Sequence, residues 1–158
     1  AMIAGITDHN DRAYDRVKGV RRALKACGLK LPEGYLVEQP YQLERARQAM
    51  RQLLELPKPP TAVICGNDVL ALGALIECQR LGFKVPGQVS IVGFDDLEIS
   101  RHFCPSLTTV HVPTEQMWER AADYLVRRLR GEVISKSLNI DVSLIVREST
   151  GPARKLAH

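Results

Sequence analysis

Short apolar segments alternate with helical patterns along this chain, and this alternation restricts the fold more than any other feature. Four such segments precede residue 100, at Met2–Ile6, Tyr35–Val37, Ala62–Cys65 and Val89–Phe94. They show little polar alternation, which is typical of strands buried on both faces. The segments between them have the three-to-four-residue spacing of amphipathic helices. This β-α-β-α order predicts an α/β fold with a parallel, doubly wound sheet and helices on both faces.

Three helices are expected between these strands, at about 11–27, 42–55 and 68–81. Glycines follow the first and the third, and three prolines follow the second, so each has a clear end. The third helix differs from the others because residues 69–76 are apolar all the way round. A helix without a polar face is buried on two sides. One side is expected to face the sheet, and the other to face another element or another subunit.

The second part of the chain continues the pattern less regularly. Asp95 to Pro105 reads as a loop with about one helical turn, and Leu107–Val112 can form a fifth strand. Thr114 to Arg130 is the longest amphipathic helix pattern. A final strand is expected where four apolar residues alternate with polar ones, at Leu138, Ile140, Val142 and Leu144.

Composition places the chain among ordinary globular domains. Apolar residues make up 45% and charged residues 25% of its 158 residues, which excludes a disordered chain, a collagen-like repeat and a disulfide scaffold. No apolar run approaches the ~18 residues that a membrane span needs, so no membrane partner is expected. The 22 basic and 18 acidic residues give a net charge of +4, which suits anionic partners without requiring them.

The four cysteines and the first 30 residues give an indication of the cellular compartment of the protein. Cys27, Cys65, Cys78 and Cys104 form no CxxC pair and have no neighbouring histidine pair, which disfavours zinc. They are expected to be reduced, small core residues. Residues 1–30 carry no basic-then-apolar leader, so no signal peptide is visible. A cytoplasmic location is therefore expected.

Polar side chains follow the predicted strands at the edge where ligands of parallel sheets bind, beyond the carboxyl ends of the strands. These residues are Asn10, Arg12, Tyr41, Asn67 and Asp95, and Arg16 lies one helical turn after Arg12. Amides, guanidinium groups, an aromatic ring and a carboxylate suit a small, polar, ring-shaped molecule. The sequence thus predicts a binding site for such a molecule on this edge.

Each candidate also has a plain structural explanation. Arg12 and Arg16 could pair with the acidic residues of their own segment, as surface ion pairs commonly do. Asn67 could serve only as a helix cap, and Tyr41 could be a partly buried loop aromatic. The side chain of Asp95 could serve only to stabilise a turn by hydrogen bonding to the nearby backbone. The sequence leaves these alternatives open.

Motifs for catalysis, metals and cofactors are absent from the sequence. It has no GxGxxG, GxxxxGK[ST], GxSxG or HExxH. Asp95 and Asp96 are adjacent on a strand, so their side chains point opposite ways and do not converge on a metal. No catalytic residue, metal site or cofactor is expected. No helix-turn-helix, basic-aromatic platform or Cys/His finger is present to read DNA.

Several motifs together resemble the LacI/GalR family of bacterial transcriptional regulators. They are Asn-Asp-Val-Leu-Ala-Leu-Gly at 67–73, Val-Pro at 85–86, Val-Ser-Ile-Val-Gly-Phe-Asp-Asp at 89–96, Pro-Ser-Leu-Thr-Thr-Val at 105–110 and Arg-Glu-Ser-Thr at 147–150. The resemblance implies half of a periplasmic-binding-protein-like (type I) effector domain. It places Arg16, Asn67 and Asp95 at recurrent effector positions, and Arg12 and Tyr41 at more variable ones.

The resemblance also implies partners and a division of the chain. It implies a sugar or purine-like effector and a homodimer with contacts at Leu70, Ala71, Leu72 and Phe103. DNA would be bound only through an N-terminal domain that, like the first effector subdomain, is not in this sequence. Residues 1–112 would form the core of the second subdomain, and 138–158 a closing strand and tail.

Residues 113–137 would carry a crossover helix that packs on the first subdomain. The apolar face of this helix consists of Trp118, Ala121, Leu125 and Leu129. Without the first subdomain this face lacks its usual partner, and it is expected to pack on another copy of the chain. The alternative function is half of a transport-type periplasmic sugar-binding protein. An enzyme is not expected, because the sequence contains no recognisable catalytic residues.

Overall fold

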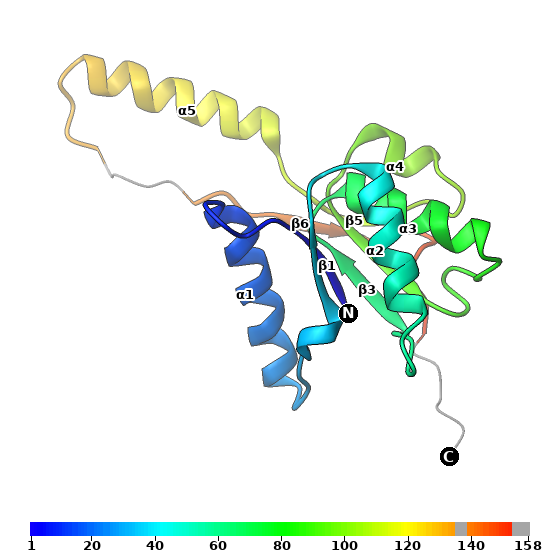
Figure 1. Ribbon diagram of the computed structural model, residues 1–158. Helices are drawn as coiled ribbons and strands as arrows, with labels where there is room; N and C mark the ends of the chain where they lie inside the picture. The colour runs from blue at the N-terminus through cyan, green and yellow to red at the C-terminus, as the bar shows by residue number, and fades with distance from the viewer. Residues whose placement is uncertain (135–138, 153–158) are drawn as a thin grey trace.

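A computed structural model describes residues 1–134 and 139–152, and within these residues one sheet of six strands forms the centre of the fold (Figure 1). The strands lie side by side in the order β2-β1-β3-β4-β5-β6. The first five are parallel, and β6 is antiparallel to β5. Their bounds are β1 Met2–Gly5, β2 Leu36–Gln39, β3 Ala62–Cys65, β4 Ser90–Asp95, β5 Thr108–His111 and β6 Ser143–Ile145.

Helices cover both faces of the sheet, which confirms the predicted doubly wound α/β fold. On one face α1 (Asp11–Ala26) packs through Val17 against Met2 and Ala4 of β1. On the other face α2 (Leu43–Leu54) and α3 (Asp68–Arg80) build the main core with the inward residues of the central strands. The remaining helices are a 3-10 turn at Glu33–Tyr35, α4 (Glu98–His102) and α5 (Thr114–Leu129).

The all-apolar stretch of α3 is covered by its own chain. The sheet lies on one side of α3 and α2 on the other, and the two helices approach so closely that a Cβ on Gly73 would lie 2.5 Å from Ala46 Cβ. Leu70 and Ala71 have no exposed surface, and Leu72 is 6% exposed.

This burial corrects the assignment of these residues to a subunit contact. Side chains without surface cannot touch a partner, so the assignment is wrong for Leu70 and Ala71. Leu72 needs no second subunit to cover it. Phe103 is only partly buried against the same core, and its part in a dimer stays a prediction.

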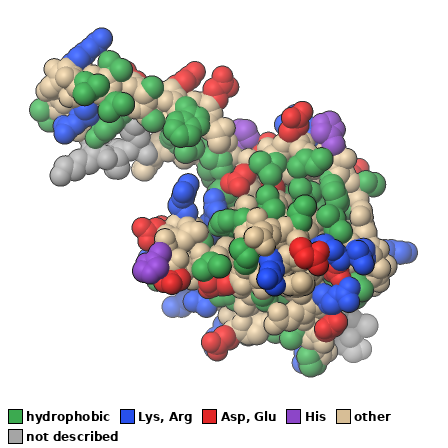
Figure 2. Space-filling model, turned by 45° about the horizontal axis from the view of Figure 1, so that its top comes forward, with side chains coloured by type: hydrophobic (Ala, Val, Ile, Leu, Met, Phe, Trp, Pro, Cys, Tyr) green, Lys and Arg blue, Asp and Glu red, His purple; other side chains and the backbone are tan. Residues whose placement is uncertain are grey.

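Helix α5 extends away from the sheet, and none of its 16 residues is buried (Figures 1 and 2). Trp118 is 74% exposed and Leu129 79%. Its apolar face is therefore uncovered by the described residues, and the helix does not fold back onto its own sheet. No helix in the described residues is long and apolar enough to cross a bilayer.

The last strand is shorter than predicted. Strand β6 spans only Ser143–Ile145, while Ile140 and Val142 precede it and Leu138 lies outside the described residues. Leu144 pairs with Val110 on the face that α1 covers at β1, but Leu144 is 58% exposed. Of the described residues of the alternating pattern, Leu144 lies in β6 and Ile140 and Val142 do not. The exposure of Leu144 shows that this strand face is uncovered in the described part of the chain.

The four cysteines divide into two pairs, which corrects the expectation that all are core residues. Cys65 and Cys78 are buried, whereas Cys27, at the end of α1, and Cys104, after α4, are exposed. All four are free thiols. Burial raises the pKa of Cys78 to about 12 and raises that of Cys65 as well.

These differences predict selective alkylation, because the thiolate is the reactive form. Iodoacetamide at pH 8 should modify Cys27 and Cys104 in the native protein and all four cysteines in urea. Mass spectrometry should then count two adducts under native conditions. Rapid native modification of Cys65 or Cys78 would contradict the buried placement.

Candidate functional site

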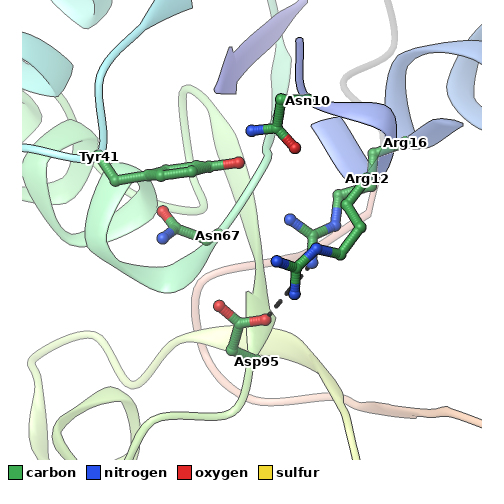
Figure 3. Close-up of a pocket in the computed structure, with 6 residues that line it drawn as sticks. All are labelled: Asn10, Arg12, Arg16, Tyr41, Asn67 and Asp95. Atoms are coloured by element: carbon green, nitrogen blue, oxygen red, sulfur yellow. Dashed lines mark ion pairs between the residues drawn. The ribbon is translucent and has the colours of Figure 1, made fainter. Parts of the chain in front are cut away.

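A pocket of about 220 Å³ lies at the carboxyl ends of the parallel strands, where the strand order predicts a ligand (Figure 3). All six residues that the sequence singled out line it: Asn10, Arg12, Arg16, Tyr41, Asn67 and Asp95. They come from the segments that follow β1, β2 and β3, from the last residue of β4 and from the first turns of α1. The topology thus brings together residues that span 86 positions of the chain, from 10 to 95.

Arg16 and Asp95 face each other across the pocket. The Arg16 Nη2 atom lies 3.6 Å from Asp95 Oδ1, an ion pair that is longer than a hydrogen bond. The guanidinium also lies over the ring of Phe94, 4.1 Å from its centroid, which fixes its plane by a cation–π contact. The structure thus favours ion pairing of Arg16 across the pocket over pairing within its own segment.

Asp95 has an environment suited to accepting hydrogen bonds. Burial raises the pKa of its carboxyl, and Asp68 nearby acts in the same direction, while Arg16 and Arg12 oppose the rise. A carboxylate that has lost part of its hydration gains more from a ligand hydroxyl or N–H than a fully solvated one does. The Asp95 carboxylate therefore has its ion-pair partner, Arg16, beyond hydrogen-bond distance, and it has lost part of its hydration.

The two asparagines cap helices as well as lining the pocket. Asn10 Oδ1 accepts the backbone N–H of Ala13 at 3.1 Å, and Asn67 Oδ1 accepts that of Leu70 at 2.9 Å. The cap interpretation is therefore correct, and it does not exclude the ligand interpretation. Each oxygen accepts one helix N–H, and the NH₂ group of each amide offers two donors that a ligand can use.

Tyr41 reaches the pocket by lying against the backbone of β1. A Cβ on Gly5 would fall 2.2 Å from the Tyr41 hydroxyl oxygen, so the ring can occupy this place only because residue 5 has no side chain. The ring lies flat between Asn10 and Asn67, with its hydroxyl directed into the pocket (Figure 3). Its position is that of a platform on which a planar or ring-shaped molecule can rest.

The role of Asp68, a buried carboxylate directly after the pocket residue Asn67, was not predicted from the sequence. Asp68 has no exposed surface, and both of its oxygens accept hydrogen bonds. Oδ2 accepts the Leu97 N–H at 2.8 Å and the Ser100 hydroxyl at 2.6 Å, and Oδ1 accepts the Thr109 hydroxyl. Asp68 thereby ties the first turn of α3 to α4 and β5. The Thr109 contact joins residues 41 positions apart, so local periodicity gives no signal for it.

Phe94, beneath Arg16, was also missed. The period-two alternation of β4 could have found it, because Phe94 lies on the same strand face as Val92, the face that α1 covers at β1.

The chemistry of the pocket is that of recognition. Its walls offer guanidinium and amide donors, a carboxylate acceptor and an aromatic face. Within the described residues, no group of three or more His, Cys, Asp or Glu side chains is placed to hold a metal ion.

Comparisons with known proteins agree with this geometry. Residues 1–150 match the family model of the periplasmic binding protein-like domain. The HTH-type transcriptional repressor CytR of Escherichia coli K12 is 40% identical over 136 residues, which are 85% of this chain and 40% of CytR. The repressor PurR of E. coli is 35% identical over 156 residues, which are 97% of this chain and 46% of PurR.

Solved structures give the same picture. The transcriptional regulator CelR in complex with cellobiose superimposes with a TM-score of 0.86 and 35% sequence identity. The match covers 94% of this chain and 46% of CelR. The chain thus spans less than half the length of these relatives.

Proposed function

Since the chain belongs to the periplasmic binding protein-like domain family, among LacI-family regulators, we propose that it is the effector-binding part of a bacterial transcriptional regulator. The observation that carries this proposal is the convergence of six polar and aromatic residues in one pocket at the strand ends. The relatives that are named as repressors favour a regulator over a transport-type binding protein.

The proposed effector is a small polar ring compound, a sugar or a purine-like molecule. Asp95 would accept hydrogen bonds from ring hydroxyls or N–H groups, and Arg16 would donate to oxygens. Tyr41 would pack against the face of the ring, and the NH₂ groups of Asn10 and Asn67 would add donors. The cellobiose complex of CelR, at 35% identity, supports a carbohydrate as one class of ligand.

Other parts of the whole protein would complete the regulator. The exposed apolar face of α5 would pack on a first effector subdomain that closes over the pocket. A separate N-terminal domain would bind DNA. A homodimer would use the apolar residues around α4, namely the exposed Leu97 and Ile99 and the partly buried Phe103. Effector binding would then shift the balance between DNA-binding and released forms of the dimer.

A thermal-shift screen of the full-length protein tests the proposal. The panel contains cellobiose, D-ribose, adenosine, cytidine and hypoxanthine. A compound present at about 100 times its dissociation constant stabilises the folded state by about 2.7 kcal/mol, which shifts Tm by several degrees. Absence of any shift across these sugars, nucleosides and bases would speak against the proposed effector classes.

Asp95→Asn links the screen to the pocket. The variant should bind the active compound about 10- to 150-fold more weakly, because it loses a charge-assisted hydrogen bond of roughly 1.5–3 kcal/mol. Asp15→Asn is the matched control, since Asp15 is exposed on α1 and does not line the pocket. Calorimetry that gives Asp95→Asn the affinity of the Asp15→Asn control would remove Asp95 from the site.

A further inference from the structure

The turn that presents Asp95 has an unusual backbone. Asp95 has φ 109° and Asp96 has φ 54°, so two successive residues with side chains lie in the left-handed region. Such a residue costs about 1–3 kcal/mol and persists only where its surroundings hold it in place. The contacts that hold this turn therefore decide where the Asp95 carboxylate points.

The side chain of Asp96 is held on both of its oxygens. Arg147 Nη2 donates to Oδ1 at 2.6 Å, and His111 Nδ1 lies 3.0 Å from Oδ2. The carboxyl is only 8% exposed. Burial acts to raise the pKa of Asp96, but the hydrogen bonds from Arg147 and His111 outweigh burial and hold the pKa below its usual value. Asp96 is therefore an ionised anchor at neutral pH.

Arg147 is itself fixed, so it can act as a support. Its Nη1 donates to the carbonyl oxygen of Leu107 at 2.8 Å, and its backbone N–H donates to the Thr108 hydroxyl at 2.9 Å. The side chain is 14% exposed. A planar guanidinium that bridges a strand carbonyl and a carboxylate has little freedom to move.

Asp95 lacks comparable support of its own. The partner recorded for its carboxylate in the described chain is Arg16, at 3.6 Å. The direction of the Asp95 side chain is therefore set by the backbone of the turn. Two contacts hold that backbone directly after Asp95. The side chain of Asp96 is bonded on both oxygens, and the Leu97 N–H donates to Asp68.

We propose that Asp96, Arg147 and His111 are positioning residues of the pocket, which hold the turn so that Asp95 points at the ligand. Arg147 would thus contribute to effector binding without lining the pocket, 51 positions after Asp96. The contribution to binding rests on the function proposed above, whereas the placement of Asp95 is a property of this chain alone. The two parts are tested separately.

The placement is tested by following the Asp95 carboxyl carbon by NMR during a pH titration of the 158-residue protein. In Arg147→Gln, the freed turn should expose Asp95 to water, and the pKa of Asp95 should fall from its raised value. Loss of the Arg147 charge alone would raise the pKa of Asp95, so the sign separates displacement from simple electrostatics. The charged groups that face Asp95 are Arg16, Arg12 and Asp68, and none of them is altered.

Two further variants make this result decisive. Arg147→Lys keeps the charge but loses the two-way guanidinium bridge, and it should also lower the pKa of Asp95; it replaces Arg147→Gln if that variant does not fold. Arg51→Gln is the control, because Arg51 also bonds a nearly buried carboxylate, Glu77, at 2.7 Å, but makes no contact with the turn. An Asp95 pKa that is unchanged or raised in the folded Arg147 variants would overturn the proposal.

The contribution to binding is tested in the full-length protein with a double-mutant cycle. Cellobiose and adenosine serve as probes, and calorimetry measures affinity. Arg147→Gln should weaken binding about tenfold when residue 95 is Asp, and by less than about twofold in the Asp95→Asn background, because coupled residues are not additive. Equal losses in both backgrounds would show that Arg147 does not act through Asp95. If neither probe binds, the proposed effector classes lose support, while the titration still decides the placement.

Discussion

Asp68→Ala is expected to lower the free energy of unfolding by about 3–5 kcal/mol, the largest loss that we expect from any single substitution in this chain. The change leaves two buried hydroxyls, those of Thr109 and Ser100, and the partly buried N–H of Leu97 without their acceptor. Gly93 makes this cluster feasible, since a Cβ there would lie 2.1 Å from Asp68 Oδ1. Urea denaturation followed by circular dichroism measures the loss.

Asp11→Ala is the matched control. Asp11 and Asp68 are each the first residue of a helix, so both interact favourably with the helix dipole, but Asp11 is exposed. The control should cost only about 0.3–1 kcal/mol. Asp68→Asn should fall between the two variants, because it keeps one acceptor oxygen. If Asp68→Ala proved no more costly than Asp11→Ala, the buried network would have no stabilising role.

The 158-residue chain is expected to associate with a second copy through α5. The exposed stripe of Trp118, Leu125 and Leu129 and the uncovered strand face around Leu144 are both apolar surfaces that water-exposed monomers avoid. In a pair of chains, α5 of one copy can cover the strand face of the other. Burying a large apolar side chain contributes roughly 1.5–3 kcal/mol, so the double variant Trp118→Glu/Leu125→Glu should raise the dissociation constant at least 100-fold.

Sedimentation velocity between 5 and 200 µM, on the order of usual working concentrations, checks this expectation. Gln116→Glu is the control, because it adds a charge to the same helix outside the apolar stripe. It should leave the association unchanged. A wild-type chain that sediments as a monomer throughout this range would contradict the prediction.

The sheet and the pocket could be predicted because both follow from local patterns and one topological rule. Apolar runs with little alternation located β1 to β4, and helical spacing located α1 to α3. Parallel strands end at one edge, so the residue types at the strand ends predicted five of the six pocket residues. The sixth, Arg16, was indicated by its place one helical turn after Arg12 and by the family resemblance. No distance information was needed for either step.

The remaining features depend on pairs of residues far apart in sequence. The apolar stretch of α3 indicated two covered sides, but not that α2 provides the second one. That choice depends on the close approach of Gly73 to Ala46, which no periodicity encodes. The bond between Arg147 and Asp96 is of the same kind. The exposure of Cys27 and Cys104 was missed because apolar neighbours in sequence are not neighbours in space.

At two strand ends, a residue that faces the pocket is followed at once by a carboxylate anchored in the interior: Asn67 by Asp68, and Asp95 by Asp96. Under the proposed function, the second residue of each pair would maintain the backbone and the first would contact the ligand, while Asn67 also caps α3. Substitution of Asp95 would then change which ring substituents are recognised, while the bonds of Asp96 keep the turn in place. On the proposed function, a single codon change at position 95 would alter ligand preference without removing the anchor that holds the turn.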